Sequence, residues 1–178
     1  LESGWIDLYH IPSKRRIIES LGRQADIRSG TERPAIVMAL QICILRDILW
    51  IVAGYEDGVL QAWTIPVSTM EPTLVWTHKS HTESIMALSM SPTCDSVLSL
   101  GADYNIVRTA LHQEAVPHVQ RIKRPGHACA SVRWDERVCV LGGWDACARV
   151  FTWPSLEPLA KLAYHKDSIY ALSFVRHD

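Results

Sequence analysis

The sequence predicts an all-β fold built from a repeated unit of four short strands. Three observations support this prediction: short β-favourable runs bounded by turn residues, a repeat of 42 to 46 residues, and no segment with the sustained 3.6-residue periodicity of a long helix. Among all-β architectures, a four-stranded unit with this period is typical of the blades of a β-propeller. With 178 residues, 48% of them hydrophobic, the chain can bury enough apolar surface to fold.

The repeat is clearest in the third strand of each unit, which ends at a Pro. Three segments align without gaps and end in an aromatic residue, Thr or His, an apolar residue and Pro: WIDLYHIP from Trp5, VLQAWTIP from Val59 and CARVFTWP from Cys147. Because Pro cannot donate to a strand ladder, we expect the strand to end there. A fourth β-favourable run follows each Pro: RRIIESL, TLVWTH and LAKLAYH.

A turn that contains Asp precedes the third strand. The turns AGYEDGVL, LGADYNIV and GGWDACAR align at Asp57, Asp103 and Asp145, which are 46 and 42 residues apart. Before each turn comes a second-strand run, ILWIV, SVLSL or RVCVL, and before that an inner-strand run, AIVMALQI, SIMALSM or CASVRW. Each unit is therefore expected to hold four strands in chain order.

The period divides the chain into blades. It places the last two strands of one blade at 1–21, three blades at about 35–78, 83–122 and 127–164, and the start of a further blade at 165–178, with SIYALSF as its inner strand. Propellers close as rings of typically 4 to 8 blades. Because the chain starts and stops within a blade, we expect a segment of a larger ring, with a complete four-bladed ring as the alternative.

The second complete blade holds a set of polar residues typical of a WD40 repeat. In such repeats a His before the inner strand, a Ser or Thr on the second strand, the turn Asp and a Trp on the third strand can form one network. A buried carboxylate and imidazole must be paired, which fixes their spacing. His81, Ser99 and Asp103 have this spacing, and Thr109 stands at the Trp position. His165 aligns with His81 and would open the network of the next blade.

The two neighbouring blades hold only parts of this network. Asp57 and Trp63 occupy the Asp and Trp positions of the first complete blade, where Ala53 replaces the Ser. In the third blade, Asp145 is the turn carboxylate and Phe151 takes the place of the Trp. We expect these residues to be structural rather than catalytic.

Two dipeptides look like the marks of a WD40 repeat but fall out of register. Trp144-Asp145 contains the turn Asp, whereas the Trp position of the strand belongs to Phe151. Gly126-His127 comes 18 residues before Asp145, too late for the network His, so His127 falls at the start of the inner strand. We interpret both dipeptides as accidental to the repeat.

These segments together resemble the fungal ASTRA-associated WD-repeat family and the related metazoan G-protein β-subunit-like proteins. The resemblance runs from Ser3 to Phe174 through SGWIDLYHIPSKRRI, VRWDERVCVLGGWDACARVF and LAKLAYHKDSIYALSF. Its most specific part is GGWDACARVF followed by LAKLAYH. One departure stands out, because the family has Gly or Ser where Ala146 follows the turn Asp. We expect Ala146 to avoid positive φ, which a side chain disfavours.

The resemblance implies a seven-bladed propeller of which this chain is the C-terminal portion. It implies a non-enzymatic adaptor of the ASTRA assembly, linked to chromatin remodelling and to the maturation of phosphatidylinositol-3-kinase-related kinases. The implied partners are ASTRA subunits, co-chaperones and the large kinases, in the nucleus and also in the cytoplasm. The alternatives are a generic WD40 interaction subunit, of the G-protein-β-like or ubiquitin-ligase-receptor kind, and a propeller hydrolase.

Enzymatic, metal and nucleic-acid functions find weaker support in the residues. His81, Ser99 and Asp103 include the residue types of a hydrolytic triad, but the repeat places Ser99 on a packed strand. A metal site from His78 and His81 would need Cys94, and none of the five cysteines forms a C-x-x-C pair, so we expect no cofactor and no metal.

Charge and aromatic residues bear on the choice of partner. Lys and Arg number 18 against 19 Asp and Glu, which argues against nucleic acid or an anionic membrane. The basic runs SKRR and RIKR fall on outer strands, where charge protects edges from pairing. Tyr55, Tyr104 and Trp144 flank the turns and are candidate anchors for a protein partner, with packing between blades as the alternative.

Overall fold

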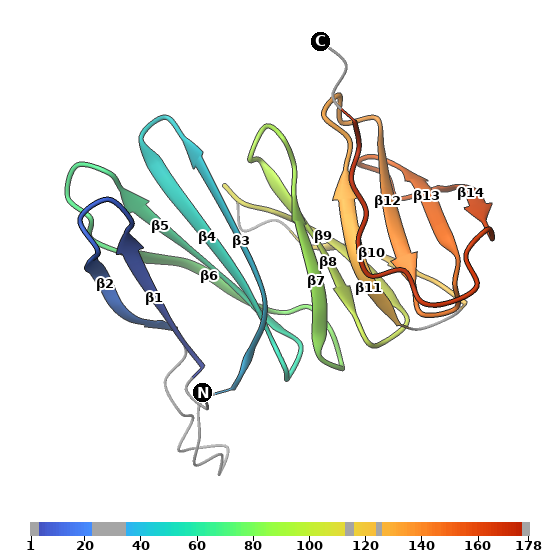
Figure 1. Cartoon of the computed structure of the whole chain (residues 1–178), viewed down its shortest axis with the longest axis horizontal. Helices are drawn as coiled ribbons and strands as arrows, with labels where there is room; N and C mark the ends of the chain where they lie inside the picture. Colours follow the sequence, from blue (N-terminus) through green and yellow to red (C-terminus); the bar gives the residue numbers. More distant parts are fainter. Residues whose placement is uncertain (1–3, 23–34, 113–115, 124–125, 176–178) are drawn as a thin grey trace.

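The computed structural model describes residues 4–22, 35–112, 116–123 and 126–175, and every regular element in these ranges is a β-strand (Figure 1). One hairpin comprises β1 (Trp5–His10) and β2 (Arg15–Gly22). The first blade comprises β3 (Val37–Leu45), β4 (Ile48–Tyr55), β5 (Val59–Pro66) and β6 (Thr73–Lys79). The second comprises β7 (Ile85–Met90), β8 (Ser96–Gly101), β9 (Asn105–Ala110) and β10 (His118–Arg121). The third comprises β11 (His127–Val132), β12 (Val138–Gly143), β13 (Ala148–Thr152) and β14 (Pro158–Leu162).

Each blade is an antiparallel meander whose strands pair in chain order, and the blades stand side by side (Figure 1). β7 lies against both β3 and β11, so the inner strands of the three blades are neighbours. The predicted all-β fold of antiparallel four-stranded blades is confirmed. The number of blades in a complete ring stays a prediction. Within the described ranges there is no helix that could span a membrane.

The strand register repeats from blade to blade. The first residue of each inner strand pairs with the residue two before the turn Asp, as Val37 with Tyr55, Ile85 with Gly101 and His127 with Gly143. The residue at the Trp position also has an equivalent pairing partner in each blade. Trp63 pairs with Ile51, Thr109 with Val97 and Phe151 with Cys139. His127 therefore stands where the second blade has Ile85, and Lys123 stands where that blade has His81.

Apolar layers between the sheets hold the blades together. One layer joins the hairpin to the first blade, a second joins the first to the second blade, and a third joins the second to the third. Because the second strands have a layer on each face, they read as continuous apolar runs such as ILWIVAGY in β4, of which all but the first residue are buried. Trp76 fixes the middle layer, since its indole Nε1 donates across it to the Leu111 carbonyl at 3.1 Å.

The predicted inner strand SIYALSF is not a regular strand, which corrects the sequence expectation. No strand is assigned within 163–175. The segment still packs as an inner strand would: Ile169 is buried against β12 and β13, and its N–H donates to the Gly143 carbonyl at 3.1 Å. Ser168 Oγ donates to the Trp144 carbonyl at 3.1 Å, as Ser84 Oγ donates to the Glu56 carbonyl at 2.7 Å between the first and second blades.

Strand β3 leaves one face uncovered. Its side chains alternate between half-buried and exposed, and the exposed ones are all apolar: Met38, Leu40, Ile42 and Ile44. The hairpin packs on the same blade but against β4 and β5, with Leu49, Ile51 and Trp63 in the shared layer. The inner part of this blade face is therefore an apolar stripe open to solvent.

Ala146 has a positive φ of 59°, contrary to the sequence expectation. The equivalent residue of the first blade, Gly58, also has a positive φ, of 78°, whereas Tyr104 at this position in the second blade does not. At Gly58 the glycine is also needed for space, since a Cβ there would overlap the His81 carbonyl. Ala146 thus adopts a left-handed turn that favours glycine.

Candidate functional site: a basic groove between two blades

The three polar residues predicted for the second blade form one buried network. His81 Nδ1 lies 3.0 Å from Asp103 Oδ1, and His81 Nε2 lies 2.9 Å from Ser99 Oγ. The backbone N–H groups of Thr82 and Asn105 also donate to the Asp103 carboxylate, each at 3.0 Å. The network ties the segment before β7 to β8 and to the turn before β9.

Burial sets the protonation state of this network. It lowers the pKa of His81, and the hydrogen bond to Asp103 only partly offsets the effect. Burial raises the pKa of Asp103, but hydrogen bonds from His81, Asn105 and Thr82 outweigh burial and hold that pKa below its ordinary value. Neutral His81 therefore donates through Nδ1 to the carboxylate and accepts through Nε2 from the Ser99 hydroxyl.

The same order of groups occurs in a hydrolytic Ser-His-Asp triad, but here it is enclosed. A nucleophile must come within about 3 Å of a substrate carbonyl, which requires an open path. Ser99 has 0% exposure on β8, and His81 and Asp103 have 2% and 5%. The arrangement therefore braces the blade and offers a substrate no access to the hydroxyl.

The remaining predicted network residues lie apart from this set. Trp63 is buried in the layer between the hairpin and the first blade, and Phe151 in the layer between the second and third blades. Asp57 Oδ1 accepts a hydrogen bond from the N–H of Val59 at 3.2 Å within its own turn. His165 is exposed after β14. The structure does not join these residues into one site.

Asp145 pairs with an arginine that sequence reasoning missed. Arg149 on β13 donates from Nη1 to Oδ1 at 2.9 Å and from Nη2 to Oδ2 at 2.5 Å. Hydrogen bonding to Arg149 lowers the pKa of Asp145 to about 2. The repeat did contain a signal for Arg149. It lies four residues after the turn Asp, where the other two blades have the uncharged residues Gln61 and Val107. Both are buried, so a charged residue there needs a partner.

The two dipeptides interpreted as accidental to the repeat are out of its register, as expected, but they are in contact with each other. Gly126 lies beneath the Trp144 ring, where a Cβ would overlap the ring, and its carbonyl accepts from the Trp144 N–H at 3.1 Å. His127 is buried beside the Asp145–Arg149 pair. Burial first, and then the charge of Arg149, lower the pKa of His127 to about 4. The dipeptides are outside the usual network but form a local set of their own.

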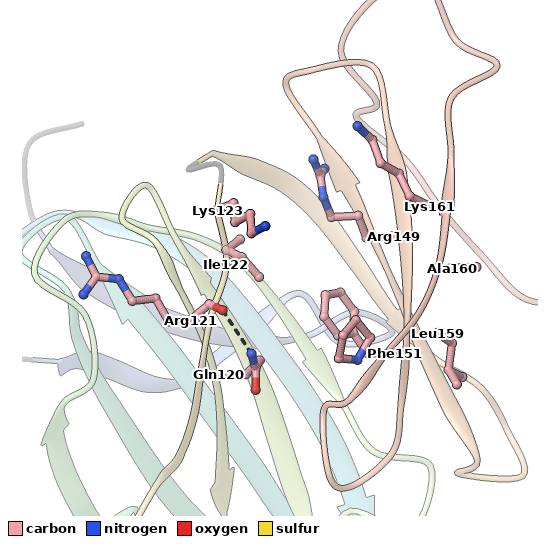
Figure 2. A pocket seen from close by; sticks show the side chains of 10 residues that line it. Gln120, Arg121, Ile122, Lys123, Arg149, Phe151, Leu159, Ala160 and Lys161 are labelled. Atoms are coloured by element: carbon pink, nitrogen blue, oxygen red, sulfur yellow. Dashed lines mark hydrogen bonds between the residues drawn. The ribbon is translucent and has the colours of Figure 1, made fainter.

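A groove of about 610 Å³ separates the outer strand of the second blade from the third blade (Figure 2). Its lining comprises Gln120, Arg121, Ile122, Lys123, Arg149, Phe151, Pro158, Leu159, Ala160 and Lys161. Figure 2 shows Arg149 and Lys161 side by side on the third blade, with Lys123 on the opposite wall and Phe151 below them. Four of the lining residues are cationic and none is acidic.

The groove continues toward an exposed aromatic residue. An adjoining hollow of about 430 Å³ is lined by Tyr104, Arg121, Ile122 and Lys123. The guanidinium of Arg121 lies over the Tyr104 ring, 5.8 Å from its centroid. Tyr104 itself is 44% exposed. The residues that line the two hollows form one continuous surface, which we call the basic groove.

Of the three aromatic residues that the sequence suggested as candidate anchors for a partner, one is buried and two are exposed. Tyr55 has 0% exposure in the layer under the hairpin, because it faces that layer from β4. Tyr104 and Trp144 are exposed. Trp144 covers Gly126, whereas Tyr104 borders the basic groove. Sequence reasoning did not identify Lys161 and Arg149 as the other wall of the basic groove, because they lie on strands of a different blade.

The chain was compared with known proteins, and no family model matches it. It aligns over 98% of its length with ASTRA-associated protein 1 of Verticillium alfalfae, at 28% identity and over 43% of that protein. The protein of the same name from Schizosaccharomyces pombe is 26% identical over 94% of the chain and 50% of its own length. Guanine nucleotide-binding protein subunit beta-like protein 1 of Mus musculus is 28% identical over 95% of the chain and 50% of its own length.

Over nearly its whole length, the chain is similar to proteins named ASTRA-associated protein 1. The resemblance predicted from the sequence is thereby confirmed. The chain spans about half the length of these curated relatives. The crystal structure of the computationally designed Ika8 protein matches with a TM-score of 0.71 and 17% identity, over 98% of this chain and 48% of that one. At such identity the likeness shows the fold alone.

The three residues that were weighed as metal ligands, and for which no metal was expected, make other contacts. His81 is held by Asp103 and Ser99, and His78 stacks on Trp76 with ring centroids 4.9 Å apart. Cys94 is a buried free thiol. Within the part of the chain that the structure describes, no three His, Cys, Asp or Glu side chains cluster as a metal site.

Proposed function

We propose that this chain is part of a WD-repeat adaptor that binds other proteins and performs no chemistry itself. The observation that carries the proposal is its similarity, over 94% to 98% of its length, to proteins named ASTRA-associated protein 1. The structure is consistent with an adaptor, because the one triad-like set is closed to solvent while the basic groove is open. Propeller proteins commonly bind partners through surfaces of this kind.

The finer proposal is a role in the ASTRA assembly. On the strength of the resemblance, the protein acts in chromatin remodelling and in the assembly and stability of phosphatidylinositol-3-kinase-related kinases. Its partners are then ASTRA subunits, co-chaperones and the large kinases, in the nucleus and also in the cytoplasm.

Affinity purification from the protein's own cells tests this proposal. A tagged copy is purified at physiological salt, and bound proteins are identified by mass spectrometry against an untagged control. We expect ASTRA subunits, co-chaperones and kinases of this class. Recovery of G-protein α subunits or ubiquitin-ligase components instead would point to the generic WD40 alternative. Imaging of the same tagged protein tests the nuclear location.

A further inference from the structure

We propose that the basic groove binds an extended, acidic segment of a partner protein, with apolar residues among its carboxylates. This inference deepens the adaptor function and rests on it, since it names the chemistry of one partner. It is carried by the charge of the groove, by its apolar floor and by the exposed Tyr104 at its end.

The charge of the groove is not balanced by its own residues. Arg149 is paired with Asp145, which neutralises one of the four cations. Arg121, Lys123 and Lys161 make no ion pair with a carboxylate in the described part of the chain. The whole chain has a formal net charge of -1, so this cluster is a local excess. A ligand with several carboxylates is therefore complementary to it.

The shape of the groove favours a narrow ligand. Phe151 lies below the cationic side chains as an apolar floor, and Ile122 and Leu159 add apolar surface to the lining, so that apolar and charged groups of a ligand can be received together. An extended peptide presents successive side chains to opposite sides, which allows alternating contacts of these two kinds. The walls include β10 and β14, which are the outermost strands of their blades.

Tyr104 and Arg121 provide an anchor at one end. Tyr and Arg are enriched among the side chains that dominate protein interfaces, and Tyr buries a large area at a small entropic cost. The guanidinium of Arg121 lies over the Tyr104 ring within the range of a cation–π interaction. An apolar or carboxylate group of the partner can pack against this pair.

A protein segment suits the site better than nucleic acid. Nucleic-acid binding usually needs a stripe of many cations, each of which neutralises a phosphate. The other basic run, at Lys14 and Arg15, lies in the β1–β2 hairpin, at the opposite end of the described structure from β14 (Figure 1). The two runs therefore do not form one continuous track.

Peptide selection on the purified chain tests the inference. A phage-displayed library of random dodecapeptides is selected in parallel on the wild-type protein and on the triple variant Arg121→Glu, Lys123→Glu, Lys161→Glu. A triple variant outside the groove, Lys14→Glu, Arg15→Glu, Arg46→Glu, is the matched control. We expect the wild type and the control to enrich peptides rich in Asp and Glu with interspersed apolar residues. The groove variant should not enrich them.

The most enriched peptide is then synthesised, and its affinity is measured by fluorescence anisotropy. We expect it to bind the groove variant at least about tenfold more weakly than the wild type, and the control within about twofold. The single variants Lys123→Gln and Lys161→Gln, which keep a long side chain, are measured in case the triple variant does not fold. The inference is overturned if no acidic peptide is enriched, if these variants bind like the wild type, or if oligothymidylate binds more tightly than the peptide.

Purification from cells separates this inference from the adaptor function. If the tagged groove variant retains every partner of the wild type, the groove inference fails while the adaptor function stands. If the wild type itself recovers no partner, the adaptor function fails. Loss of a defined subset of partners from the groove variant, with the control intact, supports both.

Discussion

At the scale of single residues, four positions in or beside the blade turns bear on stability. Asp103 gathers donors from two segments of the second blade, whereas Asp145 relies on one arginine of its own blade. Ala146 accepts a backbone conformation that glycine adopts more readily. His127 is buried in a neutral form beside a charged pair. Each of these features can be tested by a change in the free energy of unfolding.

The His81–Asp103 contact should show strong energetic coupling. Asp103→Ala removes the acceptor of several buried donors, and we expect it to lower the free energy of unfolding by about 1–3 kcal/mol. His81→Ala should cost a similar amount, and the double variant should cost less than the sum by at least about 0.5 kcal/mol. Urea denaturation of all four proteins measures the coupling. Strict additivity would show that the pair is not a unit.

Ala146→Gly should stabilise the protein. Relief of a left-handed side-chain conformation favours the folded state by about 1–2 kcal/mol, and the extra freedom of glycine in the unfolded chain costs about 0.4–1 kcal/mol. We therefore expect a net gain of about 0.5–1 kcal/mol in urea denaturation. Ala148→Gly, on β13 just beyond the turn, is the control and should destabilise. A loss of stability in Ala146→Gly would contradict the strain argument.

His127 should make stability depend on pH between about 6.5 and 4. Its pKa falls from 6.5 to about 4 on folding, because of burial and then of the charge of Arg149. In that window the unfolded chain binds a proton that the folded chain does not, so stability falls as pH falls, by up to about 3 kcal/mol. His127→Gln should lose less over the same window, although His81 contributes with the same sign in both proteins.

Denaturation curves at a series of pH values measure this difference. Above pH 7 the free energies of wild type and His127→Gln should differ by a constant amount, because neither state of the wild-type residue is protonated there. Parallel curves between pH 6.5 and 4 would show that His127 has no such effect.

At the scale of elements, the strand pattern was predictable and the packing partners were not. The runs ending at Pro66 and Pro154, and the spacing of the turn Asp residues, follow from local properties of turns and ladders, and the strands lie where these signals place them. The burial of Tyr55 depends on the hairpin, which comes from a remote part of the chain. The irregular form of SIYALSF was not predictable either, because its local β-preference favours a strand.

The candidate site shows the same limit. The network of His81, Ser99 and Asp103 was predictable because the repeat fixes its spacing. The basic groove was not, because its walls are brought together only by the packing of two blades. Lys123 and Lys161 gave no signal in sequence that they face one hollow.

The entry of β11 offers a test at this scale. Gly126 has φ of 83° and lies under Trp144, so Gly126→Ala introduces both backbone strain and a steric overlap. We expect a loss of about 2–4 kcal/mol, measured by thermal or urea denaturation. Trp144→Ala removes the overlap but not the backbone strain. Gly126→Ala should therefore cost less when it is introduced into Trp144→Ala than when it is introduced into the wild type. An equal cost in the two backgrounds would show that the ring does not restrict this position.

At the scale of the whole molecule, the described blades leave one large apolar feature in solvent. Met38, Leu40, Ile42 and Ile44 lie on one face of β3, with exposures from 38% to 67%. Contiguous exposed apolar surface of this kind promotes association.

The 178-residue chain should therefore self-associate through β3. We expect light scattering at micromolar concentration to give an average mass above that of one chain. Ile42→Thr with Ile44→Thr should bring it toward a single chain, because Thr keeps the strand preference while lowering apolar area. Ile11→Thr with Val67→Thr, at exposed positions outside the stripe, is the control and should change little. A monomeric wild type, or an equal effect of the control, would show that the stripe does not drive association, and the exposed face of β3 would then be stable in water without a cover.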